Sequence, residues 1–440
     1  MKKSQFIALF FIGFSAALWS QDHASNISNQ PIQTVEHTKK ADNPNSRFKL
    51  GVYGEAVFAR NFYSNNWKRY SQPELYKDDP SHGRADLPHF VVMMNYDFGK
   101  GWSLTTELEF EHGGVGSAIE IEEEETGEFE SEIEKGGEFV LEQMSIQKTI
   151  SPLFNIKLGH IIVPVGGVNT RHVPVKFFGN YRPEGSRTIM PNTWHQTGIS
   201  VWGKKRDWRY EVQLLPGLDA FMFSDRDWIG KGATSTFEFK IANSYAGVLR
   251  VDNTSIPGLT LGVSGYIGKS GNNSLKQDNY NQINGIVSIG SFDFMYNDHH
   301  LLIRGSADYG NLTDSDKITR ANINNSNASP SPKTPVAKAA ANLWVEAGYN
   351  LFGLSNNPKL SDQKLYLFGL YNFYDTMYKT EPTILDNKRF KKNIYAVGLN
   401  YFPINEVVIK AEFTSRMFDK PYNTENSFII GVAFTGLLIK

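Results

Sequence analysis

The stretch Trp102-Ser-Leu-Thr-Thr-Glu-Leu-Glu-Phe-Glu111 alternates between apolar and polar side chains. The apolar positions are Trp102, Leu104, Leu108 and Phe110, and the polar positions are Ser103, Thr105, Glu107, Glu109 and Glu111. Successive side chains of a β-strand point to opposite faces, so this strand needs an apolar medium on one face and water on the other. Segments of about ten residues with this pattern recur along the chain, which predicts an all-β transmembrane barrel.

The connections between the alternating segments are of two lengths. Short ones lie at 99–101, 151–152, 204–207, 253–258, 297–299 and 403–406. Long ones span roughly 61–87, 112–138, 164–194, 216–234, 269–283, 310–340, 375–392 and 415–426. Tight turns at one end and long loops at the other are typical of an antiparallel up-and-down barrel, here of about 16 strands. The connection 351–363 departs from this rhythm because it is longer than a tight turn.

A large soluble β-sandwich or propeller would also contain alternating strands. The membrane barrel is favoured because aromatic residues lie near the ends of the apolar faces, charges lie in mid-strand on the polar faces, and the long loops share one side. Glu142 is an exception, since it falls on the apolar side of the segment 140–148. Either it lies near a rim of the barrel or a β-bulge shifts the alternation there. Both faces are apolar in 245–252, 285–294 and 365–373, so their orientation stays open.

The first residues of the chain have the features of an export signal. Lys2 and Lys3 precede an apolar run at 6–14 and then small residues, which predicts a signal peptide over 1–20. A membrane anchor is the alternative, but the apolar run is short for a hydrocarbon core of ~30 Å. Residues 21–46 are polar and irregular and predict a flexible periplasmic tail, which leaves 47–440 for the barrel.

The composition excludes several kinds of site and partner. The chain has no cysteine, so it has no disulfides and no thiolate metal site. A net charge of -1 gives no reason to expect a nucleic-acid partner. Aromatic residues make up 13% of the chain, which suits the aromatic girdles of a membrane barrel.

Several motifs together resemble the phosphate-selective porin O/P family, in its Bacteroidetes-type branch. They are Leu141-Glu-Gln143, Gly159-His-Ile-Ile-Val-Pro-Val-Gly166, Tyr181-Arg-Pro-Glu184, Ile189-Met-Pro-Asn-Thr-Trp194, Arg250-Val-Asp252, Ile256-Pro-Gly-Leu-Thr-Leu-Gly262 and Tyr401-Phe-Pro403. The resemblance implies a sixteen-stranded outer-membrane porin, often a homotrimer. The arginine ladder and lysine cluster of the family's namesakes do not align with these residues, so phosphate specificity is not implied.

The third long loop, 164–194, is the one that folds into the lumen of sixteen-stranded porins. Its prolines and glycines favour an irregular course, which is tolerated at membrane depth only where it lines a water-filled cavity. Its candidate constriction residues are Arg171, His172, Lys176, Arg182, Glu184 and Arg187. The candidate pore-wall residues are Glu107, Glu109, Glu111, Lys157, Arg209, Glu211, Arg304, Asp308, Glu346, Lys410 and Glu412. The loop cations either contact solutes and set the ion preference, or brace the loop by pairing with Glu107 and Glu109.

These patterns predict an outer-membrane porin of a Gram-negative bacterium that lets small hydrophilic solutes or ions diffuse passively. An anion- or phosphate-selective channel and a plugged structural or adhesive barrel are the alternatives. Lipid and lipopolysaccharide are the expected neighbours. No enzyme motif, cofactor motif or metal-ligand spacing was found, and a barrel lipase would need a nucleophile beside a base. The acidic loop 119–134 is either a solvated run of charge or a surface site for divalent cations.

Overall fold

The computed structural model of the chain describes residues 47–79, 81–113, 120–122, 130–132, 139–234, 240–274, 277–326 and 334–439. The predicted signal peptide, the predicted periplasmic tail and most of the acidic loop 119–134 lie outside these residues.

Long antiparallel strands form a closed barrel. The described residues contain one sheet of 17 strands, and the five-residue strand β2 is its only short member, which leaves 16 barrel strands as predicted. Each long strand pairs with its neighbours in the chain, and β19 pairs with β1 to close the barrel. The strands are β1 Phe48–Asn61, β2 His82–Asp86, β3 His89–Gly99, β4 Trp102–Glu111, β7 Phe139–Ser151, β8 Phe154–Ile162, β9 His195–Lys205, β10 Trp208–Pro216, β11 Tyr245–Ile256, β12 Leu259–Lys269, β13 Ile286–Asp298, β14 Leu301–Leu312, β15 Ala339–Asn350, β16 Lys364–Lys379, β17 Lys391–Ile404, β18 Val407–Phe418 and β19 Glu425–Ile439. A separate hairpin pairs β5 Glu120–Glu122 with β6 Glu130–Glu132.

The two faces of the barrel wall differ as the alternation predicts. On the outer face of β17, Tyr395, Val397 and Leu399 are exposed, whereas Lys410 and Glu412 on the inner face of β18 are buried. Val397 is 54% exposed and Lys410 only 1%. The same division holds on β10, where Val212 and Leu214 are exposed and Glu211 and Gln213 are buried. The exposed apolar belt is what an apolar medium around the barrel requires.

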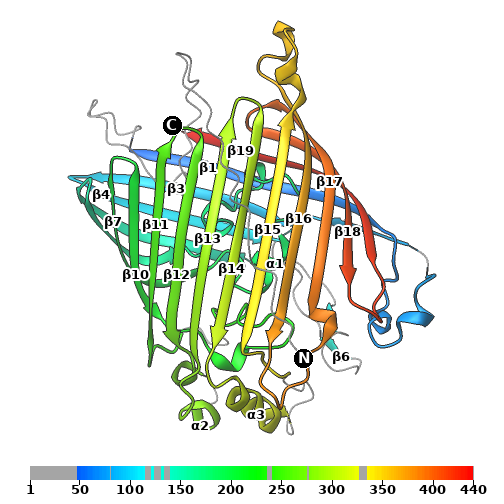
Figure 1. Cartoon of the computed structure of the whole chain (residues 1–440). Coiled ribbons are helices and arrows are strands. Elements are labelled where there is room, and N and C mark those ends of the chain that lie inside the picture. The colour runs from blue at the N-terminus through cyan, green and yellow to red at the C-terminus, as the bar shows by residue number, and fades with distance from the viewer. Residues whose placement is uncertain are drawn as a thin grey trace, which may run out of the picture. The chain divides into compact units, whose positions relative to one another are not determined.

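The two ends of the barrel carry the two kinds of connection. Tight turns join β3 to β4, β9 to β10 and β13 to β14, and the central residues Lys100, Arg206 and His299 have positive φ. Such left-handed turns match the twist of paired strands. The long loops contain the α-helices, and α2 and α3 lie at the end opposite the connection 351–363 (Figure 1). The helices are α1 Glu184–Thr188, α2 Gln277–Tyr280, α3 Ser315–Ser326, η2 Trp67–Arg69, η3 Pro73–Leu75, η4 Asn169–Arg171, η5 Pro174–Lys176, η6 Ala220–Met222, η7 Gly271–Asn273, η8 Leu351–Leu354, η9 Pro358–Leu360 and η10 Lys388–Phe390. Among the described residues, none of the helices has the length and apolar character needed to cross a bilayer.

A β-bulge explains the exceptional position of Glu142. Strand β4 pairs Glu107 with Gln143 and the next residue, Leu108, with Leu141, so Glu142 is the extra residue. The bulge turns both Glu142 and Gln143 into the interior, where they are 0% and 1% exposed. Leu141 and Met144 on either side remain exposed. The second of the two sequence interpretations is therefore the one that the structure has.

The loop end of the barrel contains an apolar core that the sequence did not predict. It joins loop 163–194, the connection 217–244, α3 and the adjoining ends of β10 to β16. Its larger members include Trp194, Leu218, Phe223, Trp228, Val287, Ile318 and Val336. The connection after β10 is also longer than expected, since β11 begins at Tyr245 rather than near residue 235. Part of the loop end is therefore packed like the interior of a soluble domain.

Candidate functional site

Residues 163–194 connect β8 to β9 and contact the inner face of distant strands, so the segment lies inside the barrel. Its short helix α1 is drawn between the strands, not beyond their ends (Figure 1). The amide of Gly185 donates to Asn372 Oδ1 at 2.9 Å, and Asn342 Nδ2 donates to Ser186 Oγ at 3.0 Å. A Cβ added to Gly185 would lie 2.1 Å from Asn342 Oδ1, so this close approach to β15 and β16 requires glycine.

Lys410 of β18 holds the loop by its main chain. Its buried ammonium group donates to the carbonyl oxygens of Pro174 at 2.8 Å, Phe177 at 3.0 Å and Gly179 at 2.7 Å. The ammonium group has three hydrogens and no accepting capacity, so three carbonyls satisfy it completely. The same group lies 4.3 Å from the centre of the Phe177 ring. A wall residue predicted to face solutes is therefore a structural anchor.

Two wall carboxylates accept from the loop's amide groups. The amide of Phe178 lies 3.3 Å from both oxygens of Glu346, and the amide of Asn180 donates to Glu412 Oε2 at 3.2 Å. Glu346 also forms an ion pair with Arg304. The inner wall thus contacts both the amide and the carbonyl groups of residues 174–180. These contacts satisfy main-chain groups that an irregular segment could not pair by itself.

Glu184, the single acid of the loop, pairs with cations of the wall. Its Oε2 accepts from Arg416 Nε at 2.9 Å and Nη2 at 2.5 Å, and its Oε1 accepts from Lys392 at 3.3 Å and the Tyr374 hydroxyl at 2.5 Å. Burial alone would raise the pKa of this carboxyl, but Arg416, Lys392 and Arg187 outweigh burial and hold its pKa well below the ordinary value. Arg416 also donates to Glu425, so the charges continue towards the rim.

The loop cations do not brace the loop in the way that the sequence suggested. Among the described residues, Arg171, Lys176, Arg182 and Arg187 form no ion pair with a carboxylate, and Glu107 and Glu109 are not their partners. Arg182 is buried and donates to Asn192 Oδ1 at 3.2 Å and to Thr193. Arg187 is exposed and lies 5.6 Å from the Tyr181 ring centre. Lys176 is exposed and Arg171 is half-buried.

The remaining predicted wall residues face the interior in polar clusters. Arg209 pairs with Glu211, which also accepts from Ser200 at 2.8 Å and from Gln213. Lys157 is half-buried on the inward side of β8. Asp308 accepts from Ser291, Ser306 and Asn342.

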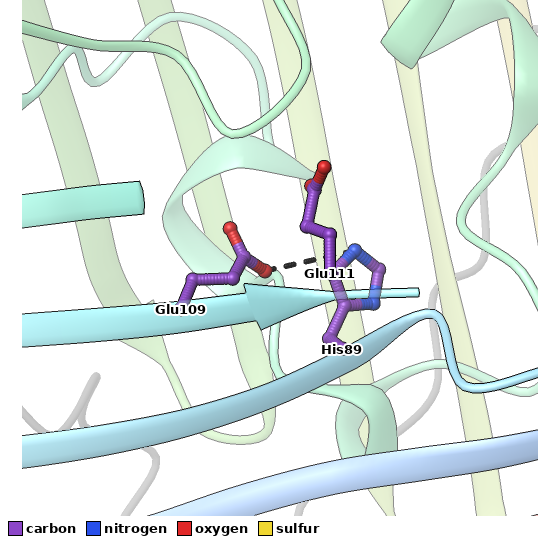
Figure 2. Close-up of side chains that lie close together, drawn as sticks. All are labelled: His89, Glu109 and Glu111. Atoms are coloured by element: carbon purple, nitrogen blue, oxygen red, sulfur yellow. Dashed lines mark ion pairs between the residues drawn. The ribbon is translucent and has the colours of Figure 1, made fainter. Parts of the chain in front are cut away.

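A second polar cluster lies where β3, β4 and β7 meet loop 163–194. Figure 2 shows the side chains of His89, Glu109 and Glu111 converging, with an ion pair of 3.7 Å between His89 Nε2 and Glu109 Oε1. The other nitrogen of His89 bonds to Glu55 at 2.7 Å. Glu107, Glu142 and the loop residue His172 form an adjoining group in the interior. Burial, together with Arg182, lowers the pKa of His172 to about 3, so its ring is neutral.

Several interior residues were missed because strand ends and faces were misjudged. Arg416 and Glu425 fell within the predicted loop 415–426, and Lys392 within the predicted loop 375–392, but strands β17, β18 and β19 extend to include them. Arg250 makes a two-pronged pair with Asp293 at 2.9 and 3.0 Å. Both lie in segments whose orientation was left open. Leu249 is exposed on the outer face, and its neighbour Arg250 therefore points into the barrel. The alternation of an apolar and a charged residue at these two positions was the sequence signal that could have placed Arg250 inside.

Comparisons with known proteins bear on the fold. No protein-family model matches the chain. An uncharacterized protein of Aquifex aeolicus strain VF5 is 26% identical over 366 residues, which are 83% of this chain and 74% of that protein. The fold is similar to that of Pseudomonas putida OprB, with a TM-score of 0.53 and 9% identity over 89% of this chain and 95% of OprB. It is also similar to Salmonella typhi OmpF, solved in complex with daunomycin, with a TM-score of 0.52 and 10% identity over 90% of this chain and 99% of OmpF. The chain therefore has a porin-like barrel fold of 16 strands.

Proposed function

We propose that this chain is an outer-membrane porin through which small hydrophilic solutes or ions diffuse passively, with no catalytic step. The observation that carries the proposal is the way in which loop 163–194 is held. The wall binds the loop through its main chain and Glu184, which leaves Arg171, Lys176 and Arg187 without carboxylate partners among the described residues. Cations presented in this way inside a barrel act on passing ions.

The same observation favours a second candidate function, an anion-preferring channel. The inward acids Glu346, Glu412 and Glu211 are occupied by hydrogen bonds or ion pairs, whereas the exposed cations of the loop are not. A field from unpaired cations attracts anions and repels cations. This preference agrees with the resemblance to phosphate-selective porins, although a preference for phosphate itself is a further step.

The third candidate function is a plugged structural barrel. The apolar core at the loop end favours it, because that core occupies part of the barrel mouth. Against a plug stand the exposed charges of Lys176 and Arg187, which need contact with water.

Surroundings and assembly follow from the same proposal. The exposed apolar belt would face the lipid of a Gram-negative outer membrane, with lipopolysaccharide on the loop side. We further propose a homotrimer of barrels, as the resemblance to the porin family implies.

The test measures conductance and reversal potential in planar bilayers under a potassium chloride gradient. The wild type is compared with the double variant K176Q/R187Q and with the matched control K204Q/K205Q, which removes two exposed charges at the short turn after β9. We expect all three proteins to conduct in triplet steps. Only in K176Q/R187Q should the reversal potential shift in the direction of greater cation preference. Equal reversal potentials in all three proteins would show that Lys176 and Arg187 do not set the ion preference. Absence of conductance in the wild type would refute the porin proposal and favour the third candidate, a plugged structural barrel.

A further inference from the structure

Three metal-ligating side chains meet where loop 163–194 rests on the barrel wall. They are Glu107 of β4, Glu142 of β7 and His172 of the loop, and one ligand atom from each lies within 4.8 Å of the others. All three side chains are buried, with exposed fractions of 7%, 0% and 6%. The group uses none of the side chains of the Lys410 and Glu184 anchors.

The ring of His172 has one nitrogen committed to a hydrogen bond and one nitrogen free. Its Nδ1 lies 2.9 Å from the carbonyl oxygen of Asn169. A carbonyl oxygen can only accept, so Nδ1 carries the hydrogen and Nε2 carries a lone pair. That Nε2 is buried and has no hydrogen-bond partner among the described residues. A histidine that donates one ring N–H to a carbonyl and keeps the other nitrogen free, in a group that holds two carboxylates, has the arrangement of a metal ligand.

One oxygen of each carboxylate is held by a neighbouring side chain. Gln143 donates to Glu107 Oε2, and the Tyr53 hydroxyl lies 3.4 Å from Glu142 Oε2. Glu142 Oε1 is buried and has no hydrogen-bond partner among the described residues, whereas Oε1 of the adjacent Glu109 faces His89 Nε2 at 3.7 Å. Hydrogen bonds to one oxygen fix the direction of the other, which is how surrounding residues orient ligating carboxylates.

The charges near the group leave the carboxylates poorly neutralised. Glu109 acts on both Glu107 and Glu142, and the cations that act on these two carboxylates are Lys157 on Glu107 and Arg182 on Glu142. Neither cation forms an ion pair with these carboxylates within the described residues, and two nitrogens of Arg182 are buried without partners. Buried carboxylates need a proton, a paired cation or a metal ion.

We propose that Glu107, Glu142 and His172 bind a divalent metal ion of the Zn²⁺ or Mn²⁺ class. The imidazole nitrogen suits Zn²⁺, a borderline-soft ion, and the two carboxylate oxygens suit Zn²⁺ and Mn²⁺, whereas Ca²⁺ and Mg²⁺ take oxygen ligands alone. Zinc-ligand bonds of ~2.0–2.2 Å require the ligand atoms to close to about 3.3 Å from one another. The ligand atoms lie within 4.8 Å of one another, so shifts of roughly an ångström in each side chain would bring them to this spacing.

The neighbouring group in Figure 2 is less suited to hold the ion. Both nitrogens of His89 already face carboxylates, since Nδ1 bonds to Glu55 and Nε2 faces Glu109. A histidine between two carboxylates is in the arrangement of an ion pair. His89 and Glu111 therefore provide matched control positions of the same residue types.

The test is metal binding by the full-length protein folded in detergent, and it does not depend on whether the barrel conducts. The protein is folded with Zn²⁺, freed of excess metal and analysed for zinc per chain. The same is done for His172→Gln and Glu142→Gln and for the controls His89→Gln and Glu111→Gln. Far-UV circular dichroism and the gel shift on heating establish that each variant is folded.

We expect about one zinc ion per barrel in the wild type and in both controls. Because loss of even a supporting residue weakens metal binding 10–100-fold, His172→Gln and Glu142→Gln should weaken it by at least about 100-fold. X-ray absorption of the wild-type zinc complex should show a single imidazole among oxygen ligands, a readout that needs no variant. Failure to bind Zn²⁺ or Mn²⁺ would overturn the proposal. Protonation would then be the way in which the buried carboxyls of Glu107 and Glu142 are neutralised. Loss of zinc in His89→Gln with retention in His172→Gln would overturn it in favour of the group in Figure 2.

Discussion

Replacing Lys410 by methionine would remove three hydrogen bonds from the main chain of loop 163–194 while keeping most of the side-chain volume. The ammonium group lies 2.7 to 3.0 Å from three loop carbonyls, and each bond from a charged donor is worth about 1.5–3 kcal/mol. Their simple sum of roughly 5–9 kcal/mol is an upper limit, because burying the ammonium group in the folded state costs several kcal/mol. We therefore expect a net loss of about 3 kcal/mol in the free energy that holds residues 174–180 against the wall.

The effect should be local because β18 keeps its pairing with β17 and β19. A change of about 3 kcal/mol raises the fraction of open loop about a hundredfold. Hydrogen exchange followed by mass spectrometry measures this directly, because the amides of Phe178 and Asn180 are protected by Glu346 and Glu412. The matched control is Lys205→Met, which removes an exposed lysine at a short turn.

We expect peptides covering 173–181 to exchange about a hundredfold faster in Lys410→Met, with strand peptides unchanged. The control should match the wild type throughout. An exchange rate in 173–181 that stays within about threefold of the wild type, in a folded variant, would refute the claim that Lys410 anchors the loop.

Three further changes test other contacts of the loops. Glu184→Gln removes the partner of two wall cations and should lower the free energy of unfolding by about 2–4 kcal/mol, whereas the exposed Glu74→Gln should leave the thermal unfolding temperature unchanged. Gly185→Ala places a Cβ 2.1 Å from Asn342 Oδ1 and should cost about 1–3 kcal/mol in the same unfolding measurement; an unchanged unfolding temperature would contradict the close packing of α1. Burial raises the pKa of Asp225 to about 6 from 3.8, so the stability that its proton provides is present at low pH and is lost as pH rises through about 6. Asp225→Asn should therefore stabilise the protein by on the order of 2 kcal/mol at pH 8 and not at pH 4, and equal effects at both pH values would exclude this titration.

The barrel could be predicted because its signal is local. Alternation within 102–111 and 407–414 assigns each side chain to a face without any knowledge of the neighbouring strands. Strand ends were less certain, because the loop was predicted to begin at 415, whereas β18 continues to Phe418 and the alternation that places Lys410 and Glu412 inside also places Arg416 inside. The bulge at Glu142 required a choice that only the pairing with β4 decides.

The contacts of loop 163–194 could not be predicted because they join residues far apart in the chain. Lys410 follows its partner Gly179 by 231 residues, and Arg416 follows Glu184 by 232. Composition suggested that loop cations would meet wall acids, whereas wall groups bind the loop's main chain and its single acid. Every residue has a main-chain carbonyl, so neither residue type nor a count of charges could reveal which carbonyls Lys410 would bind.

The barrel wall holds loop 163–194 by its main chain, so exposed side chains of the loop can be replaced without loss of these hydrogen bonds. Residues such as Lys176 and Arg187 contribute nothing to the hydrogen bonds at Lys410, Glu346 and Glu412, so mutation at those positions can alter the charge along the loop without detaching it. Under the proposed porin function, variation at these two positions would change which ions pass and would keep the same attachment of the loop to the wall.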